Sequence, residues 1–192
     1  MGWAGTRDVG AGVGADAQMV YRLALGFKQR WGMAAYYAES TRQWLTHSFP
    51  LFTAEFRHQN GAWRREQVSQ VLAVRITSFG GLLDKLAPGA ALIRPDFQLV
   101  LFKTRSRISF LRYMMGVWTN RPYSRPDIEI LPATECRCFP IDAGARSPSS
   151  AKNIYAEADG ELLGTLPVSI FMSNETVNLL IPATASAGTA VL

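Results

Sequence analysis

Apolar and polar residues alternate with a period of two along much of this chain, which predicts β-strands. The clearest alternation covers residues 154–159, and two shorter ones follow at residues 168–172 and 177–181. Between the first two stands Asp159-Gly160, a dipeptide typical of a tight hairpin turn. Earlier strands are predicted at residues 52–57, 68–76, 97–102, 128–131 and 136–139.

A period near 3.6 residues predicts helices in three further places. We expect Asp16 to cap the first helix, whose apolar stripe is Met19, Leu23 and Phe27. A second helix is predicted over about residues 34–45 and a third over residues 106–120. In the third, apolar residues recur at spacings of three, four and three: Ile108, Leu111, Met115 and Trp118. The predicted fold class is mainly β with α (α+β), an antiparallel β-sandwich decorated by about three helices.

Length and composition suit one globular domain with a substantial core. The chain has 192 residues, of which 48% are hydrophobic and 18% are charged. We predict a single domain over residues 1–182 and a tail over residues 183–192. No apolar run approaches the roughly 20 residues needed to span a bilayer. Cys136 and Cys138 are too close together for an ordinary disulfide and too few for a zinc site, so we expect a reduced, cytoplasmic compartment.

The chain is basic, with a net charge of +5 and an isoelectric point near 9.5. Such a charge favours contact with anionic surfaces, either membranes or nucleic acids. The basic residues are scattered, with small clusters at Arg64-Arg65 and residues 103–107. No aromatic-rich RNA motif or zinc-finger spacing accompanies them. Nucleic acid is therefore not an expected partner, whereas peripheral contact with an anionic membrane stays open.

Two short motifs carry candidate chemistry. Gly10, Gly12 and Ala15 satisfy the dinucleotide pattern G-x-G-x-x-A, but only nine residues come before it and no β-α-β repeat follows. The pattern needs that context, so we exclude a Rossmann fold. Asp159 and Glu161 flank the predicted hairpin turn, where two carboxylates would be fixed in place for acid–base or metal chemistry. From spacing alone, such a stretch is usually just a hairpin.

Several segments in order resemble the C-terminal domain of the diacylglycerol kinase and sphingosine kinase-like lipid kinases, which share their fold with NAD kinases. The segments are Gly12-Val-Gly14-Ala-Asp16-Ala17, Lys28-x-x-x-Gly32-x-x-Ala35-Tyr36, Phe79-Gly80-Gly81 with Pro88-x-Ala90-x-Leu92, Asp159-Gly160-Glu161 with Leu166-Pro167, and Leu180-Ile181-Pro182. The resemblance runs from about residue 9 to residue 182. It implies a β-sandwich that forms one wall of a cleft, with an N-terminal nucleotide-binding domain as the other wall.

The resemblance also implies roles for individual residues. Glu161 would be the carboxylate that faces the cleft, a candidate general base for the lipid hydroxyl, with its position fixed by Asp159 and Gly160. The remaining positions would line or brace the cleft and the domain junction: Gly12, Gly14, Asp16, Gly80 and Gly81. For the glycines among them, a structural role is favoured over contact with substrate. The substrate would be diacylglycerol or a related lipid, which places the chain in phospholipid metabolism.

Two departures from the family pattern bear on cofactors. No Gly-Gly-Asp-Gly loop occurs in the sequence, so we expect this chain to lack the nucleotide-binding half. ATP and Mg²⁺ are implied for the complete enzyme, and neither is expected to bind this chain alone. After Ala90-x-Leu92 the family has an Asp-Gly step whose aspartate can hold a metal. Here Arg94-Pro95 stands at that step, and an arginine cannot ligate a cation, so no metal is expected there.

Two functions stay open on this evidence. The chain is either the substrate-side domain of an ATP-dependent lipid kinase, inactive alone, or a stand-alone module with the same fold that binds lipid or protein. In either case, a nucleotide-binding domain or a homodimer partner would cover the docking face. Enzyme activity of the chain itself is not decided by the sequence.

Overall fold

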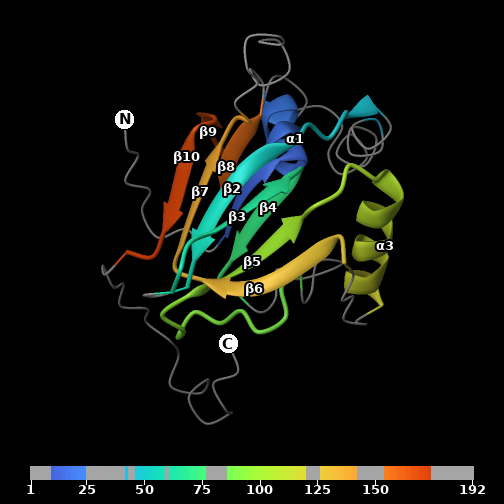
Figure 1. Cartoon of the computed structure of the whole chain (residues 1–192). Coiled ribbons are helices and arrows are strands. Elements are labelled where there is room, and N and C mark those ends of the chain that lie inside the picture. The colour runs from blue at the N-terminus through green and yellow to red at the C-terminus, as the bar shows by residue number, and fades with distance from the viewer. Residues whose placement is uncertain are drawn as a thin grey trace, which may run out of the picture.

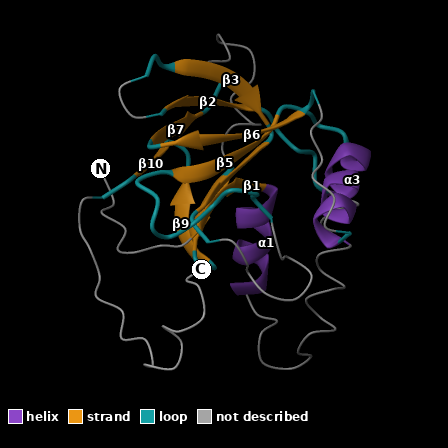
Figure 2. Ribbon diagram, turned by 90° about the horizontal axis from the view of Figure 1, so that it is seen from below, coloured by secondary structure: helices purple, strands orange, loops and turns teal. Residues whose placement is uncertain are grey.

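Two antiparallel sheets packed face to face, with helices on the outer side of the larger one, make up the described structure (Figures 1 and 2). The computed structural model describes residues 10–24, 42, 46–58, 61–76, 86–119, 126–141 and 154–173. The larger sheet has six strands in the order β6-β5-β4-β1-β8-β9, and the smaller has four in the order β10-β7-β2-β3. This arrangement confirms the predicted α+β sandwich.

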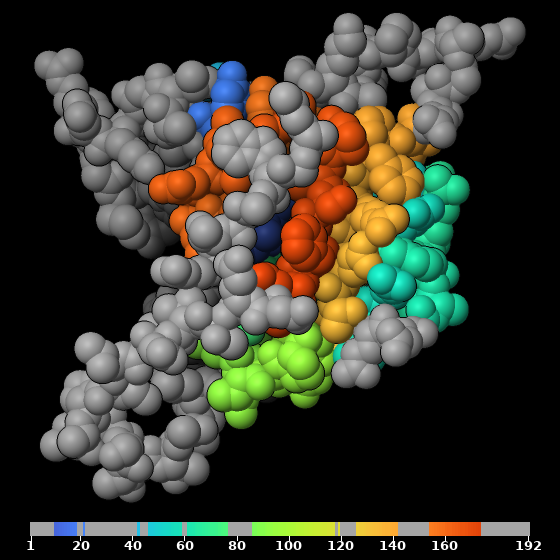
Figure 3. All heavy atoms as spheres, turned by 90° about the vertical axis from the view of Figure 1, so that its left-hand side faces the viewer, coloured from blue at the N-terminus to red at the C-terminus, as the bar shows by residue number. Residues whose placement is uncertain are grey.

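The strands of the larger sheet are β1 (Gly10–Gly14), β4 (Gln70–Val74), β5 (Phe97–Phe102), β6 (Ile128–Ala133), β8 (Tyr155–Ala158) and β9 (Glu161–Thr165). Those of the smaller sheet are β2 (Phe52–Arg57), β3 (Arg64–Val68), β7 (Glu135–Phe139) and β10 (Val168–Phe171). Figure 3 shows β10, β7 and the β2–β3 hairpin following one another across one face of the molecule. The strands predicted near 52–57, 97–102, 128–131, 136–139 and 168–172 are confirmed within one or two residues.

The main core lies between the two sheets. Alternate residues of each strand point inward, so that Phe52 and Phe56 of the smaller sheet meet Val71, Leu99 and Leu101 of the larger one, all fully buried. Cys136 and Cys138 of β7 share this core as free thiols, because a spacing of two residues puts both on the same side of a strand.

The chain crosses between sheets at single residues. Ser69 joins β3 of the smaller sheet to β4 of the larger, and its N–H donates to the Phe102 carbonyl at 2.8 Å. Thr134 joins β6 to β7 in the same way. The prediction of one strand over residues 68–76 was therefore wrong. Val68 at the end of β3 and all of β4 are buried on either side of Ser69, so the change of sheet leaves no break in the run of buried residues.

Two helices cover the outer face of the larger sheet. α1 (Ala15–Ala24) lies on β1, β8 and β9, and α3 (Arg107–Trp118) lies on β4 and β5 through a second apolar cluster. Ser106 caps α3, since its hydroxyl accepts from the Ser109 N–H at 3.3 Å. Asp16 does not cap α1 as predicted: the helix already begins at Ala15, which places Asp16 in its first turn.

One face of α3 is buried against the larger sheet, and the opposite face is exposed. Phe110, Tyr113 and Met114 pack towards the sheet, whereas Ile108 and Leu111 of the predicted apolar stripe are exposed. Other predictions fall outside the described residues: the strand at 177–181, nearly all of the helix at 34–45, and the tail. None of the helices in the described ranges is long and apolar enough to cross a bilayer.

Candidate functional site: a clamped acidic hairpin

The predicted turn at Asp159-Gly160 forms as a two-residue hairpin loop. Ala158 of β8 pairs with Glu161 of β9, and the two residues between them both have positive φ, +46° at Asp159 and +80° at Gly160. Two successive positive φ angles define the hairpin turn that matches the twist of antiparallel strands. Glycine tolerates this conformation freely and aspartate more readily than most residues, so the dipeptide dictates the turn.

Two carboxylates clamp this turn. Asp159 Oδ1 accepts a hydrogen bond from the Gly10 N–H at 3.0 Å, while the Asp159 N–H donates to the Gly10 carbonyl at 3.0 Å. On the other side, Glu157 Oε2 accepts from the Gly160 N–H at 2.8 Å. The end of the hairpin is thereby fixed both to the start of β1 and to its own strand.

Glu161 follows directly after the clamped turn. It is the first residue of β9, the edge strand of the larger sheet, and its side chain is exposed. Its backbone is positioned by the pairing with Ala158, so an exposed carboxylate stands on a fixed scaffold at the rim of the sheet. The assignment of Glu161 as a general base stays a prediction.

Glu157 also forms a buried carboxylate pair with Asp16, which lies in the first turn of α1. Glu157 is only 7% exposed, and its Oε1 and Asp16 Oδ2 converge on the space above Gly12. A Cβ atom at Gly12 would lie 2.7 Å from the first oxygen and 3.0 Å from the second. Because glycine has no side chain, there is space for both carboxylates next to residue 12.

Burial favours the protonated forms of both carboxyl groups, and for Glu157 repulsion from Asp16 adds to it. Burial, with the neighbouring Asp16 as the next cause, raises the pKa of Glu157 to about 7, against the opposing effect of the Gly160 hydrogen bond. Burial also raises the pKa of Asp16. A carboxyl group that titrates near neutrality beside a fixed turn is a feature often found at functional sites.

Sequence reasoning missed Glu157. Its alternation with Ala156 and Ala158 predicted a solvent-facing side chain on a half-buried strand. In the structure, α1 covers that face of β8, and Tyr21 of the helix stacks on Tyr155 with ring centroids 4.3 Å apart. Only the pairing of Gly12 with Glu157 across strands would have revealed the position, and strand pairing cannot be read from this sequence alone.

Gly14 stands where the fold leaves no room for a side chain. It ends β1 with φ of +113°, and a Cβ there would lie 2.6 Å from the Ser69 carbonyl oxygen. A side chain is therefore excluded both by backbone conformation and by contact with rigid backbone. Gly80 and Gly81, the other glycines assigned to the cleft, lie outside the described residues.

Comparisons with known proteins bear on the fold. No protein-family model and no curated protein matches this sequence. Two solved structures of proteins assigned as diacylglycerol kinases in Bacillus anthracis strain Sterne match at 15% and 13% identity, with TM-scores of 0.52 and 0.54. They cover 84% and 86% of this chain. The fold is that of a diacylglycerol kinase-like domain.

This diacylglycerol kinase-like domain spans about half the length of the structures it matches, 48% and 52% of those chains. A third structure from the same strain, described as a diacylglycerol kinase, matches at 11% identity with a TM-score of 0.46, over 85% of this chain and 46% of that one. The predicted resemblance to one domain of a two-domain protein is confirmed at the level of fold.

The loop that departs from the family pattern is closed by an ion pair. Arg94 Nε and Nη2 donate to the two oxygens of Asp96 at 2.6 and 2.7 Å, and Asp96 is 2% exposed. The hydrogen bonds from Arg94 are the main cause of a lowered pKa at Asp96. An arginine thus supplies the positive charge beside this carboxylate.

Strand register brings this loop and the hairpin to one end of the larger sheet. Gly10, next to the Asp159 turn, pairs with Val74, and Val74 pairs with Gln98 near the start of β5. Asp96 immediately precedes β5. The clamped hairpin, the start of β1 and the Arg94–Asp96 pair therefore lie at the same end of the larger sheet.

Proposed function

We propose that this chain is the substrate-side domain of an ATP-dependent lipid kinase that phosphorylates the hydroxyl of diacylglycerol or a related lipid. The observation that carries the proposal is the clamped hairpin, which fixes the backbone before an exposed Glu161 at the rim of a diacylglycerol kinase-like fold. A general base must be held within hydrogen-bond reach of the proton it removes, and two hydrogen-bonded carboxylates supply that rigidity here.

In the proposed reaction, Glu161 accepts the proton of the lipid hydroxyl while the hydroxyl oxygen bonds to the γ-phosphorus of ATP. The bond from that phosphorus to the β,γ-bridging oxygen breaks, and ADP leaves. Positioning and charge neutralisation dominate phosphoryl transfer, so the base contributes mainly by orienting the hydroxyl. Asp159 acts through the turn as a positioning residue.

ATP and Mg²⁺ would be held chiefly by a second domain. The sequence contains no Gly-Gly-Asp-Gly loop to cradle phosphates, and at the metal-holding step of the family an arginine already pairs with Asp96. Bound Mg²⁺ would neutralise the charge on the transferred phosphoryl group. We therefore expect the chain to be inactive alone and active when a nucleotide-binding domain covers its docking face.

Complementation tests the proposal. The chain is mixed with a separately produced nucleotide-binding domain of a related diacylglycerol kinase, and transfer of labelled phosphate from Mg²⁺-ATP to dispersed diacylglycerol is measured. We expect transfer from the mixture and none from either part. The Glu161→Gln variant should lose on the order of a hundredfold or more in rate. Glu55→Gln, which removes a carboxylate from the smaller sheet, is the matched control.

Three outcomes would contradict the proposal. Transfer by the chain alone would mean that it holds a complete site. Full activity of Glu161→Gln in the mixture would mean that another group serves as the base. If no nucleotide-binding domain restores transfer although the chain binds diacylglycerol, the chain is a binding module.

A further inference from the structure

The outward side of α3 carries an apolar stripe that the fold leaves uncovered. Ile108, Leu111 and Met115 are 59%, 46% and 46% exposed and recur at helical spacing. The opposite side of the helix is anchored: the Tyr113 ring packs edge-on against Phe102, and its hydroxyl donates to the Leu86 carbonyl. The helix cannot roll its stripe inward without breaking that packing, so within the described residues the stripe is fixed on the outer side.

Charge along this part of the chain is entirely of one sign. Between Asp96 and Asp127 the sequence has six basic residues and no acidic one: Lys103, Arg105, Arg107, Arg112, Arg121 and Arg125. Because the net charge of the whole chain is +5, the remainder carries a net charge of −1. The net positive charge of the sequence thus falls within residues 97–126, the stretch that contains α3.

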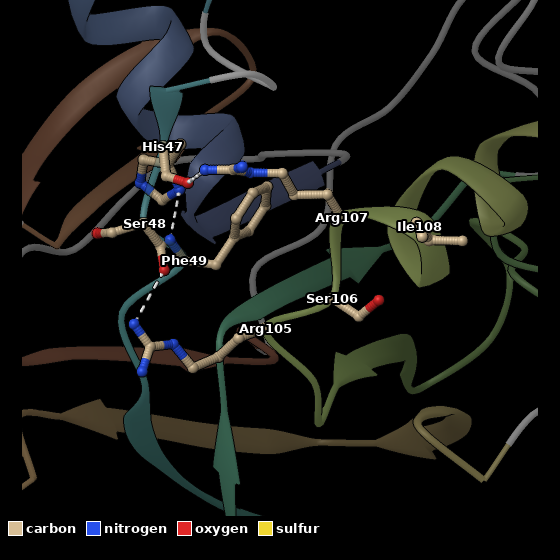
Figure 4. Close-up of a pocket in the computed structure, with 7 residues that line it drawn as sticks. All are labelled: His47, Ser48, Phe49, Arg105, Ser106, Arg107 and Ile108. Carbon is tan, nitrogen blue, oxygen red and sulfur yellow. Dashed lines mark hydrogen bonds between the residues drawn. The ribbon is translucent and has the colours of Figure 1, made fainter.

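A pocket lies at the N-terminal end of this helix (Figure 4). It has a volume of about 530 Å³ and is lined by His47, Ser48, Phe49, Arg105, Ser106, Arg107 and Ile108. Arg105 Nη2 donates to the Ser48 carbonyl at 3.2 Å and Arg107 Nη2 to the His47 carbonyl at 3.1 Å, which holds both guanidinium groups in the pocket wall. The N-terminus of a helix adds partial positive charge at the same place.

Figure 4 also shows that Ile108 points away from the two carbonyls that the arginines contact. Arg112, four residues after Ile108 and three before Met115, lies beside the apolar stripe on the exposed side of the helix. We call Arg105, Arg107, Ile108, Leu111, Arg112 and Met115 the α3 surface; all six are exposed.

We propose that the α3 surface docks onto an anionic phospholipid bilayer. The apolar stripe enters the boundary between headgroups and acyl chains, and the flanking arginines contact lipid phosphates. Docking of this kind combines apolar area that leaves water with positive charge that attracts anionic lipid. A nucleic acid would match the charge but not the three apolar side chains, and the absence of acidic groups from α3 disfavours a basic protein partner.

The inference adds a partner to the proposed function without depending on Glu161. Docking through α3 would hold the chain at the surface in which a diacylglycerol substrate resides. Vesicle binding needs neither nucleotide nor a second domain, so the protein can bind vesicles even if phosphate transfer fails. Phosphate transfer to dispersed lipid can likewise succeed even if vesicle binding fails.

Vesicle sedimentation with the full chain tests the inference. One set of vesicles is phosphatidylcholine alone, and the other is an equal mixture of phosphatidylcholine and phosphatidylglycerol. We expect binding to the anionic vesicles, weakened by added salt, and much weaker binding to the neutral ones. Binding of the Glu161→Gln variant should equal that of the wild type.

Two variants and their controls assign the binding to α3. Arg112→Gln should weaken binding to anionic vesicles roughly fivefold. The double variant Ile108→Gln, Leu111→Gln should weaken it about tenfold or more, because two apolar side chains no longer leave water. Arg65→Gln and Ile93→Gln remove an exposed arginine and an exposed isoleucine elsewhere and should bind as the wild type. Glutamine keeps helix propensity, and circular dichroism checks that all variants fold.

The inference is overturned if the wild type does not bind vesicles, binds neutral and anionic vesicles equally, or binds undiminished after the α3 substitutions. It is also overturned if inorganic phosphate at concentrations too low to screen charge displaces the protein from vesicles. That result would show a small-anion pocket at the N-terminus of α3 instead of a bilayer-docking surface.

Discussion

The substitution Glu157→Gln tests the buried carboxylate pair most sharply. Glutamine keeps an acceptor oxygen for the Gly160 N–H but cannot ionise. In the wild type the pKa of Glu157 is raised to about 7 from an ordinary 4.5. The folded state therefore favours the protonated form. The stability this contributes is complete below about pH 4.5 and is lost as the pH rises through about 7.

The size of the effect follows from the two pKa values. A difference of about 2.5 units corresponds to roughly 3 kcal/mol, and partial access of water to the hairpin lowers this to about 2–3 kcal/mol. At about pH 8 the Glu157→Gln variant should exceed the wild type in unfolding free energy by that amount, whereas at about pH 4 the two should be nearly equal.

Urea denaturation followed by far-ultraviolet circular dichroism, at several pH values between about 4 and 8, measures the difference. The exposed Glu161, from the same hairpin, provides the control: Glu161→Gln should leave the pH dependence of the wild type intact. If the wild type and Glu157→Gln lose stability equally as the pH rises, Glu157 is not buried beside a second carboxylate and the described site is wrong.

Two further predictions concern the same region. Asp16→Asn removes the like charge nearest to Glu157, so the variant should lose stability at a lower pH than the wild type in the same urea titrations. An unchanged midpoint would show that Asp16 does not influence Glu157. Gly14→Ala should cost about 3 kcal/mol or more in unfolding free energy, because strain at positive φ adds to contact with the Ser69 carbonyl. Gly160→Ala, with positive φ but open space around it, should cost only about 1 kcal/mol; equal losses would refute the distinction.

Local patterns were enough to predict most strands and the hairpin. The period of two marks a strand with one covered face wherever it occurs, and Asp159-Gly160 encodes its turn through its own backbone preferences. Ser106 likewise marks the start of α3 because a serine side chain can cap a helix. Each of these features is decided within a few neighbouring residues.

Features that depend on packing between distant segments were not predictable. The chain changes sheets at Ser69 without a turn signal, since Val68 before it and the whole of β4 after it are buried. Sequence alternation predicts a solvent-facing Glu157. The packing of α1 over β8 buries this side chain and brings Asp16 next to it. The apolar stripe of α3 predicted a helix correctly, but sequence periodicity does not tell a covered stripe from an exposed one.

The most direct test of the central claim compares Glu161→Gln with Glu157→Gln in the complemented phosphate-transfer assay. The proposal predicts that Glu161→Gln loses on the order of a hundredfold or more in rate. Glu157→Gln should retain most activity because its amide still holds the turn. Near-complete loss in Glu157→Gln together with full activity in Glu161→Gln would contradict the proposal and move the base to the buried carboxylate.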